Sequence, residues 1–143
     1  MPILDTEFIF GLSSTDSKHR DVIKMLKKIK AGEVNNVAVS DIAILETYMV
    51  LRNRGKTDEV KIIFQKLNEI CSEYGIKEIN TLNKNLILRQ MSIENELDVK
   101  SKFFDSLIAA SAEMHDYSII SDDSVYDRLG LKRINLSGGD EDE

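Results

Sequence analysis

Four carboxylates lie at positions where a folded chain seldom tolerates a charge. Asp5 follows the apolar residues of PIL, and Asp123 closely follows the β-branched run YSII. Glu46 and Asp105 each interrupt an apolar pattern with helical spacing. A buried carboxylate is costly unless it is paired or bound to a metal, and such local violations are expected at functional sites. These four residues are therefore the candidates for chemistry.

Glu46 lies in DIAILETYMVL. Its neighbours three and four residues away are Ile42, Ala43, Met49 and Val50. All four are apolar, so a helix would place Glu46 within its buried stripe. No Lys or Arg shares this stripe. The pattern predicts a carboxylate that points toward the interior without a local partner.

Asp105 repeats this pattern in SKFFDSLIAASA, where it shares a helical face with Ile108, Ala109 and Ala112. The small residues would let this helix approach a sheet closely. Lys102 is the only cation near Asp105 in the sequence. We therefore expect a second inward-facing acid.

Carboxylates that converge repel one another unless a cation lies between them. Oxygen ligands without His or Cys select a hard cation, so the hypothesis is a Mg²⁺ or Mn²⁺ site. Two His and one Cys are too few for a structural zinc site. Thr6 and Ser121 could hydrogen-bond the ligands or a phosphate, and Asp122 could be a neighbour of the site or a solvated acid.

Each carboxylate also has an ordinary structural explanation. Asp5 could cap a helix that begins at Glu7, and Glu46 could pair with a Lys or Arg from elsewhere in the chain. Asp105 could be favoured by the dipole at a helix N-terminus. The acidic pair in SDDSVYD could be a solvated turn. The metal hypothesis depends on all four acids reaching one place.

Short apolar runs alternate with amphipathic stretches along the chain. The expected strands are 2–6, 35–40, 76–80, 117–121 and 132–137, and the expected helices are 19–33, 41–55, 57–75, 81–99, 101–117 and 124–130. Strands separated by helices predict an α/β fold, a three-layer α/β/α sandwich around a mostly parallel sheet. Ligands bind outside the carboxyl ends of such strands, which is where Asp5 and Asp123 fall.

Composition predicts one domain of residues 1–137 followed by a disordered acidic tail, 138–143, of sequence GGDEDE. The lone Cys71 excludes an intramolecular disulfide, and no apolar run is long enough to span a bilayer. We therefore expect a cytoplasmic protein. The net charge of −6 argues against broad electrostatic binding to polyanions, although four of the acids lie in the tail.

Four segments resemble, in order, the motifs of the PIN-domain family. LDTEFIF is similar to its hydrophobic–Asp–Thr–Asn/Ser start, and SDIAILE to its S-x₅-E segment. FDSLIAASA is similar to its D-x-x-I-A-A-x-A helix, and ISDDSVYDRL to its T-x-D-x-x-F segment. The resemblance runs from Ile3 to about Leu136. It departs at Glu7, where Asn or Ser is usual, and at Ser121, which replaces Thr.

The resemblance implies a divalent-metal-dependent ribonuclease. Asp5, Asp105 and Asp123 would be direct metal ligands, and Glu46 would act directly or through water. Many small members are VapC-type toxins and often dimers, so the resemblance also implies an RNA substrate, an antitoxin protein as a further partner and a homodimer. Water as the nucleophile implies products with a 5′-phosphate and a 3′-hydroxyl.

Two basic clusters could contact RNA phosphates. Arg52, Arg54 and Lys56 lie where the helix of Glu46 ends, and the run KHR at 18–20 precedes the first long helix. A solvated charged face is the alternative for both. The sequence alone does not choose between these interpretations.

Three other functions are compatible with parts of the sequence. The chain could be a non-catalytic PIN scaffold that acts as a binding or assembly module, or a housekeeping RNA-processing nuclease. It could also be a haloacid-dehalogenase-like phosphatase, because LDTEF resembles an Asp-x-Asp nucleophile. The phosphatase reading leaves Glu46 and Asp105 unexplained and requires Asp at position 7.

Overall fold

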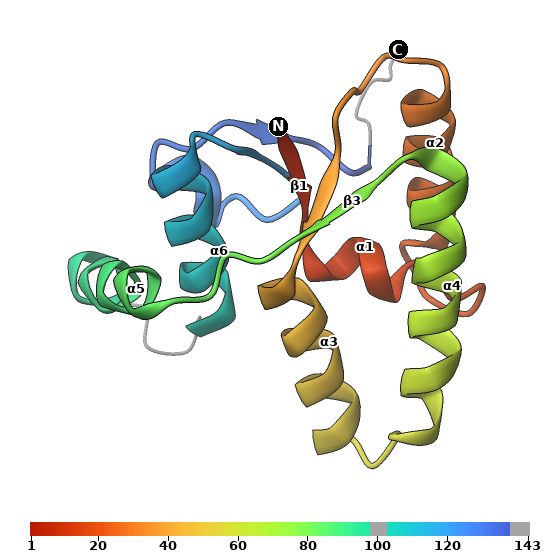
Figure 1. Ribbon diagram of the computed structural model, residues 1–143, viewed down its shortest axis with the longest axis horizontal. Helices are drawn as coiled ribbons and strands as arrows, with labels where there is room; N and C mark the ends of the chain where they lie inside the picture. Colours follow the sequence, from red (N-terminus) through yellow and green to blue (C-terminus); the bar gives the residue numbers. More distant parts are fainter. Residues whose placement is uncertain (98–102, 138–143) are drawn as a thin grey trace.

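The computed structural model describes residues 1–97 and 103–137, and its centre is a five-stranded parallel sheet with helices on both faces (Figure 1). The strand order is β3-β2-β1-β4-β5, and every neighbouring pair is parallel. The strands are β1 (Pro2–Leu4), β2 (Ala38–Ser40), β3 (Lys77–Ile79), β4 (Ser118–Ile120) and β5 (Arg133–Ile134). The predicted α/β/α class is confirmed.

The helices follow the predicted order with one addition. They are α1 (Thr6–Phe10), α2 (His19–Lys30), α3 (Asp41–Asn53), α4 (Asp58–Tyr74), α5 (Lys84–Leu97), α6 (Phe103–His115) and α7 (Val125–Arg128). The addition is α1, which was expected only as the helix at Glu7 that Asp5 could cap, because TEFIF is too short to show a helical period. The predicted tail and the end of the expected helix 81–99 lie outside the described residues.

Alternate residues of the strands build two separate cores. Leu4 and Ile120 face one side of the sheet, where they pack with α1, α2 and α4. Ile3 and Ile119 face the other side and pack with α6 and α7. The registers Ile3↔Ile119 and Leu4↔Ile120 keep these layers aligned across β1 and β4. A slip of one residue would move the side chains of a strand to the opposite face of the sheet. The aligned register also sets where β1 and β4 end relative to each other.

The chain order reverses at the centre of the sheet. From β1 the chain moves outward through β2 to β3, then crosses back to β4 on the other side of β1. The carboxyl ends of β1 and β4 flank this switch point, where parallel sheets bind ligands. Asp5 follows β1 directly, and the segment 121–124 follows β4.

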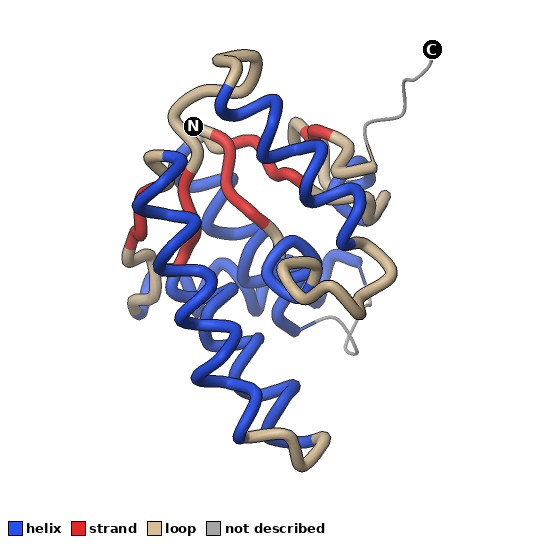
Figure 2. Tube along the Cα trace, turned by 90° about the vertical axis from the view of Figure 1, so that its right-hand side faces the viewer, coloured by secondary structure: helices blue, strands red, loops and turns tan. Residues whose placement is uncertain are grey.

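Helices α3 and α4 form a hairpin that extends well past the sheet (Figures 1 and 2). Ser40 begins α3 by accepting a hydrogen bond from the Ala43 N–H at 3.4 Å. The hairpin therefore starts at the carboxyl end of β2, next to the switch point, and carries Glu46 in its first turns. Among the described residues, no helix is both long and apolar enough to cross a membrane.

Candidate active site

Asp5 is both a helix cap and the most buried acid at the switch point. Its Oδ1 accepts a hydrogen bond from Thr6 N at 2.8 Å, which caps α1, and its Oδ2 accepts one from Ser121 Oγ at 2.8 Å. Only 6% of Asp5 is exposed. Burial raises its pKa to about 7, and repulsion from Asp105 and Glu7 adds to the rise, which the two hydrogen bonds only partly offset. The capping role proposed for Asp5 is therefore real, and the capping residue is also an unusually basic carboxylate.

Glu46 lies half-buried on α3 and turns toward α1. The hydroxyl of Thr6 donates a hydrogen bond to Glu46 Oε1. Burial raises the pKa of Glu46, and the nearby charge of Asp105 raises it further. Among the described residues, no Lys, Arg or His forms an ion pair with Glu46. The pairing with a distant cation that could have explained Glu46 is absent from that part of the chain.

Asp123 is joined to Asp5 through one hydroxyl. The Asp123 N–H donates to Ser121 Oγ at 3.0 Å, and that same oxygen donates to Asp5. Asp123 Oδ1 in turn accepts from Val125 N at 3.0 Å, which begins α7. The acidic pair is thus a turn, as the ordinary explanation held, and the turn lies beside Asp5.

Asp105 comes to this place from α6, on the opposite face of the sheet from α1. Its carboxylate lies 3.4 Å from the hydroxyl of Tyr126, which is fully buried. Burial raises the pKa of Tyr126 well above its usual value, and all four candidate acids raise it further. The buried hydroxyl of Tyr126 therefore lies within electrostatic reach of Asp5, Glu46, Asp105 and Asp123. No local pattern in the sequence predicted the contact of Tyr126 with Asp105.

The donor set suits a hard divalent cation, although the side chains are not closed around one. Within residues 1–97 and 103–137, no three His, Cys, Asp or Glu side chains lie close enough together to hold a metal ion. The converging groups are carboxylate oxygens, the ligands that Mg²⁺ and Mn²⁺ prefer. The raised pKa of Asp5 marks buried negative charge that a cation would offset. Binding would require some of the four side chains to draw closer together.

Asp122, the other acid of the turn, is engaged by different groups. Its Oδ2 is paired with Lys18 Nζ, and its Oδ1 accepts hydrogen bonds from Ser137 N at 2.9 Å and Ser137 Oγ at 3.0 Å. Its backbone N–H donates to Glu7 Oε1 at 2.6 Å. The ion pair with Lys18 helps to hold the pKa of Asp122 below its usual value. Asp122 therefore fixes the turn, and sequence reasoning did not foresee its partners.

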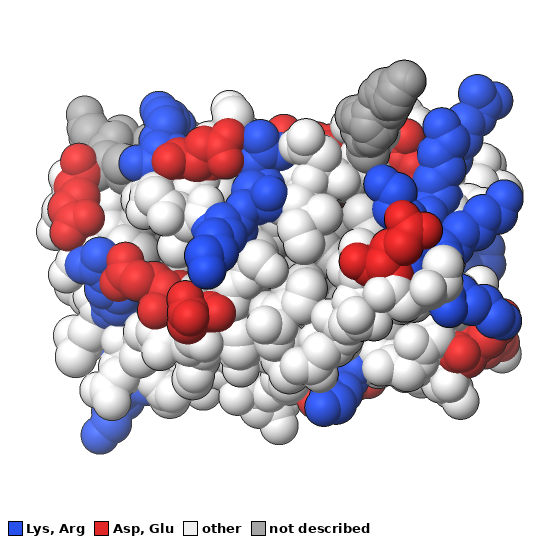
Figure 3. All heavy atoms as spheres, turned by 90° about the horizontal axis from the view of Figure 1, so that it is seen from above, with Lys and Arg blue, Asp and Glu red and all other residues white. Residues whose placement is uncertain are grey.

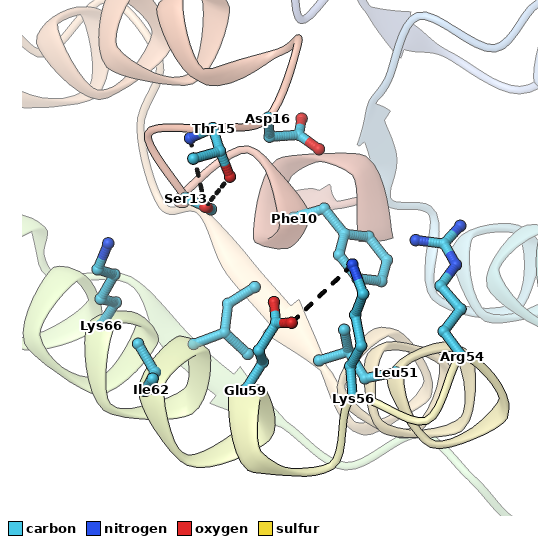
Figure 4. Close-up of a pocket in the computed structure, with 11 residues that line it drawn as sticks. Phe10, Ser13, Thr15, Asp16, Leu51, Arg54, Lys56, Glu59, Ile62 and Lys66 are labelled. Atoms are coloured by element: carbon cyan, nitrogen blue, oxygen red, sulfur yellow. Dashed lines mark hydrogen bonds and ion pairs between the residues drawn. The ribbon is translucent and has the colours of Figure 1, made fainter.

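The cluster Arg52, Arg54 and Lys56 lies exposed at the far end of the α3–α4 hairpin. Arg54 stacks over the Phe10 ring at 5.9 Å from its centroid. Figure 4 shows Arg54 and Lys56 on the rim of a pocket of about 330 Å³ between α1, the loop after it and the hairpin. The pocket lies at the Phe10 end of α1, whereas Asp5 caps the other end of that helix, and none of the four candidate acids lines it.

Comparison with known proteins agrees with this architecture. The PIN domain family matches residues 3–132. No curated protein matches the chain significantly.

Three solved structures share the fold at low sequence identity. A toxin-antitoxin complex from Klebsiella pneumoniae has a TM-score of 0.61 at 15% identity, covering 95% of this chain and 98% of that one. The sarcin-ricin-loop-cleaving toxin VapC20 of Mycobacterium tuberculosis has a TM-score of 0.61 at 15% identity, and the match covers 92% of this chain and 96% of that one. FitAcB from Neisseria gonorrhoeae has a TM-score of 0.63 at 16% identity, and the match covers 96% of this chain and 99% of that one.

Proposed function

Since the chain belongs to the PIN-domain family, we propose that it is a divalent-metal-dependent ribonuclease with Asp5, Glu46, Asp105 and Asp123 at its metal site. The observation that carries this proposal is a set of hydrogen bonds at the switch point: Ser121 joins Asp5 to Asp123, Thr6 donates to Glu46, and the buried Tyr126 hydroxyl donates to Asp105. Four acids from four different elements are not needed to stabilise a fold, and each costs stability when it is buried without a cation.

Asp5, Asp105 and Asp123 would hold the metal directly, with Glu46 direct or through water. Bound Mg²⁺ or Mn²⁺ would act as a Lewis acid that activates water and offsets charge on the phosphate. Ser121 and Thr6 hold Asp5 and Glu46 in place by donating to their carboxylates. Tyr126 fills the space behind the acids and keeps solvent out. The expected products carry a 5′-phosphate and a 3′-hydroxyl.

The biological role that we propose is the toxin of a toxin–antitoxin pair in the cytoplasm. Support comes from two solved structures of the same fold, a toxin-antitoxin complex and a sarcin-ricin-loop-cleaving toxin. An antitoxin protein and a second copy of the chain would then be partners. Arg52, Arg54 and Lys56 remain candidates for phosphate contacts, since all three are exposed and Arg54 and Lys56 line a pocket beside α1.

A non-catalytic binding module is the second candidate. The observation that favours it is that no three acidic, His or Cys side chains in the described part of the chain lie close enough to hold a metal. A phosphatase of the haloacid-dehalogenase kind has no such support, because the family match is to the PIN domain.

Calorimetric titration with Mn²⁺ separates the two candidates. We expect wild-type protein to bind, and Asp105→Asn to weaken binding at least tenfold because an ionised ligand is removed. Asp116→Asn is the matched control, since Asp116 is exposed just after the other end of α6. Failure of the wild-type protein to bind Mn²⁺ would overturn the nuclease proposal and favour the binding module.

A further inference from the structure

The segment between β4 and α7 carries Asp123 and is held from several sides. The Asp122 N–H donates to Glu7 Oε1 at 2.6 Å, across 115 positions of the sequence. On the other side of the turn, Arg133 donates to the carbonyl oxygen of Ser121 at 3.0 Å. The contact from Glu7 is made at Asp122, the residue before Asp123, and Glu7 belongs to α1, the helix that Asp5 caps.

The carboxylate of Asp122 cannot take over the role of Glu7, because both of its oxygens already have other partners. Lys18 and Ser137 occupy both of its oxygens. Those two contacts restrain the side chain of Asp122, whereas Glu7 restrains its backbone. Loss of Glu7 would leave the Asp122 N–H without its carboxylate acceptor. Asp122 directly precedes Asp123, so the backbone that presents Asp123 would lose a restraint.

We propose that Glu7 is a positioning residue that fixes the backbone of the β4–α7 segment, so that Asp123 is presented toward Asp5 and Asp105. This proposal rests on the proposed function for its catalytic consequence, but the contact itself does not. Glu7 would act through its carboxylate Oε1, which accepts the hydrogen bond from the Asp122 N–H. Its negative charge would be secondary, because a neutral amide offers the same acceptor at the same reach.

The test compares Glu7→Gln with Glu7→Ala in the full chain. Hydrogen exchange of the Asp122 amide is measured by NMR without metal, and Mn²⁺ affinity is measured by calorimetry. We expect Glu7→Ala to speed exchange roughly tenfold or more, because the Asp122 N–H loses its hydrogen-bond acceptor, and to weaken Mn²⁺ binding about 10- to 100-fold. Glu7→Gln should retain most of both. Glu33→Ala, at an exposed position, is the control.

Each result has one meaning. Equal damage from the Gln and Ala variants would overturn positioning and assign the effect to the charge of Glu7. Unchanged exchange in Glu7→Ala would overturn the proposal outright. Faster exchange in Glu7→Ala with no Mn²⁺ binding by any form, wild type included, would support the contact and overturn only the proposed metal site.

A second and independent observation concerns α2. One face of this helix carries cations at successive turns: Arg20, Lys24, Lys27 and Lys28, which we call the α2 basic stripe. The opposite face, with Val22, Met25 and Leu26, is buried against the core. Figure 3 shows Lys and Arg side chains gathered at the right-hand end of the face viewed from above, the end at which α2 lies in Figure 1.

The helix dipole does not explain the whole stripe. Lys27 and Lys28 are in the last turn, where cations stabilise a helix, but Arg20 is in the first turn, where a cation opposes the dipole. The stripe also begins beside the candidate site, because the preceding Lys18 is the N-cap of α2 and pairs with Asp122. Cations that repeat about every 6 Å along a rigid helix suit the regular charges of a nucleic-acid strand.

We infer that the α2 basic stripe binds the phosphates of a single RNA strand that leads into the candidate site. This inference rests on the proposed function for the identity of the ligand. A chain with a net charge of −6 does not attract RNA over its whole surface, so a local stripe is what could direct a strand toward the carboxylates.

Fluorescence anisotropy with labelled single-stranded RNA in EDTA measures binding without cleavage. One variant replaces the four stripe residues by Gln, and a control of equal charge replaces four exposed lysines elsewhere: Lys61, Lys77, Lys84 and Lys132. We expect the stripe variant to reduce the slope of log K against log salt by up to about 3, at roughly 0.7 per phosphate contact. Similar changes in both variants would overturn the stripe as a site. An unchanged salt dependence of RNA binding in the stripe variant would also overturn the α2 basic stripe as an RNA site. An acidic polypeptide would then be the ligand that suits its charge.

Discussion

Ser121 donates a 2.8 Å hydrogen bond to the buried carboxylate of Asp5, 116 positions earlier in the chain. The same hydroxyl accepts from Asp123 N at 3.0 Å. One side chain therefore sets the relative position of two of the proposed metal ligands, across the switch point of the sheet.

Replacing Ser121 by Ala should destabilise the metal-free protein by about 1–3 kcal/mol, because Asp5 and the Asp123 N–H both lose a partner in a buried place. Urea unfolding measures the change. Ser121→Thr should restore most of it. Ser111→Ala is the control: Ser111 is fully buried, and its hydroxyl has no hydrogen-bond partner among the described residues. A loss at Ser111 as large as that at Ser121 would contradict the account.

Asp5 should make the stability of the metal-free protein depend on pH. Its pKa is raised from 3.8 to about 7 in the folded state, so the folded state binds the proton more tightly than the unfolded state. Stability from this group is therefore fully present below about pH 4 and is lost as pH rises through 7. Asp5→Asn removes the penalty, so it should be the more stable form at pH 8, by on the order of a few kcal/mol.

Thermal unfolding of both forms in EDTA, from pH 5 to pH 8, measures this effect. The advantage of Asp5→Asn should shrink as the pH falls, and the exposed Asp58→Asn should show no such trend. Stability of the wild-type protein that rises relative to Asp5→Asn between pH 5 and pH 8 would show that the pKa shift has the opposite sign.

Tyr126→Phe should keep the fold but alter the site. The ring stays in its buried place, while Asp105 loses the hydroxyl that lies 3.4 Å away. We expect Mn²⁺ affinity to fall roughly tenfold or more, as it does when groups that support metal ligands are removed. Calorimetry measures this, and Tyr74→Phe, on α4 beneath Lys30, is the control. Equal affinities for Tyr126→Phe and wild type would remove Tyr126 from the site.

Gly11 tests how closely α1 and α2 pack. A Cβ atom at this position would lie only 2.4 Å from Val22 Cγ2 and 3.2 Å from the Glu7 carbonyl oxygen. Gly11→Ala should therefore cost about 1–3 kcal/mol of unfolding free energy through overpacking. Gly130→Ala is the comparison, because it has a positive φ but open space around it. A smaller loss at Gly11 than at Gly130, in denaturant titrations, would show that the helices yield easily.

The sequence predicted the fold and the elements of the site better than it predicted their contacts. Asp5 was locatable because it ends an apolar strand, and Glu46 because helical spacing puts it among apolar residues. The short helix α1 was foreseen only through its possible cap, Asp5, since five residues do not complete two turns and show no helical period. The ion pair of Lys18 with Asp122 joins residues 104 positions apart, and no local pattern reports such a contact.

The role of Tyr126 was likewise out of reach. Its place in a short turn of helix predicts burial, but only the packing of α6 against the sheet brings Asp105 to its hydroxyl. The predicted single domain of residues 1–137 and the identity of the catalytic residues stay predictions.

If the proposed function is right, the four carboxylates form one metal-dependent site for RNA hydrolysis. The most direct measurement is cleavage of a mixed pool of single-stranded and structured RNA by the purified protein in Mg²⁺, Mn²⁺ or EDTA, beside Asp105→Asn and the control Asp116→Asn. We predict cleavage with either metal that leaves 5′-phosphate ends, stops in EDTA and is lost only in Asp105→Asn. Cleavage that persists in EDTA or in Asp105→Asn would contradict the claim.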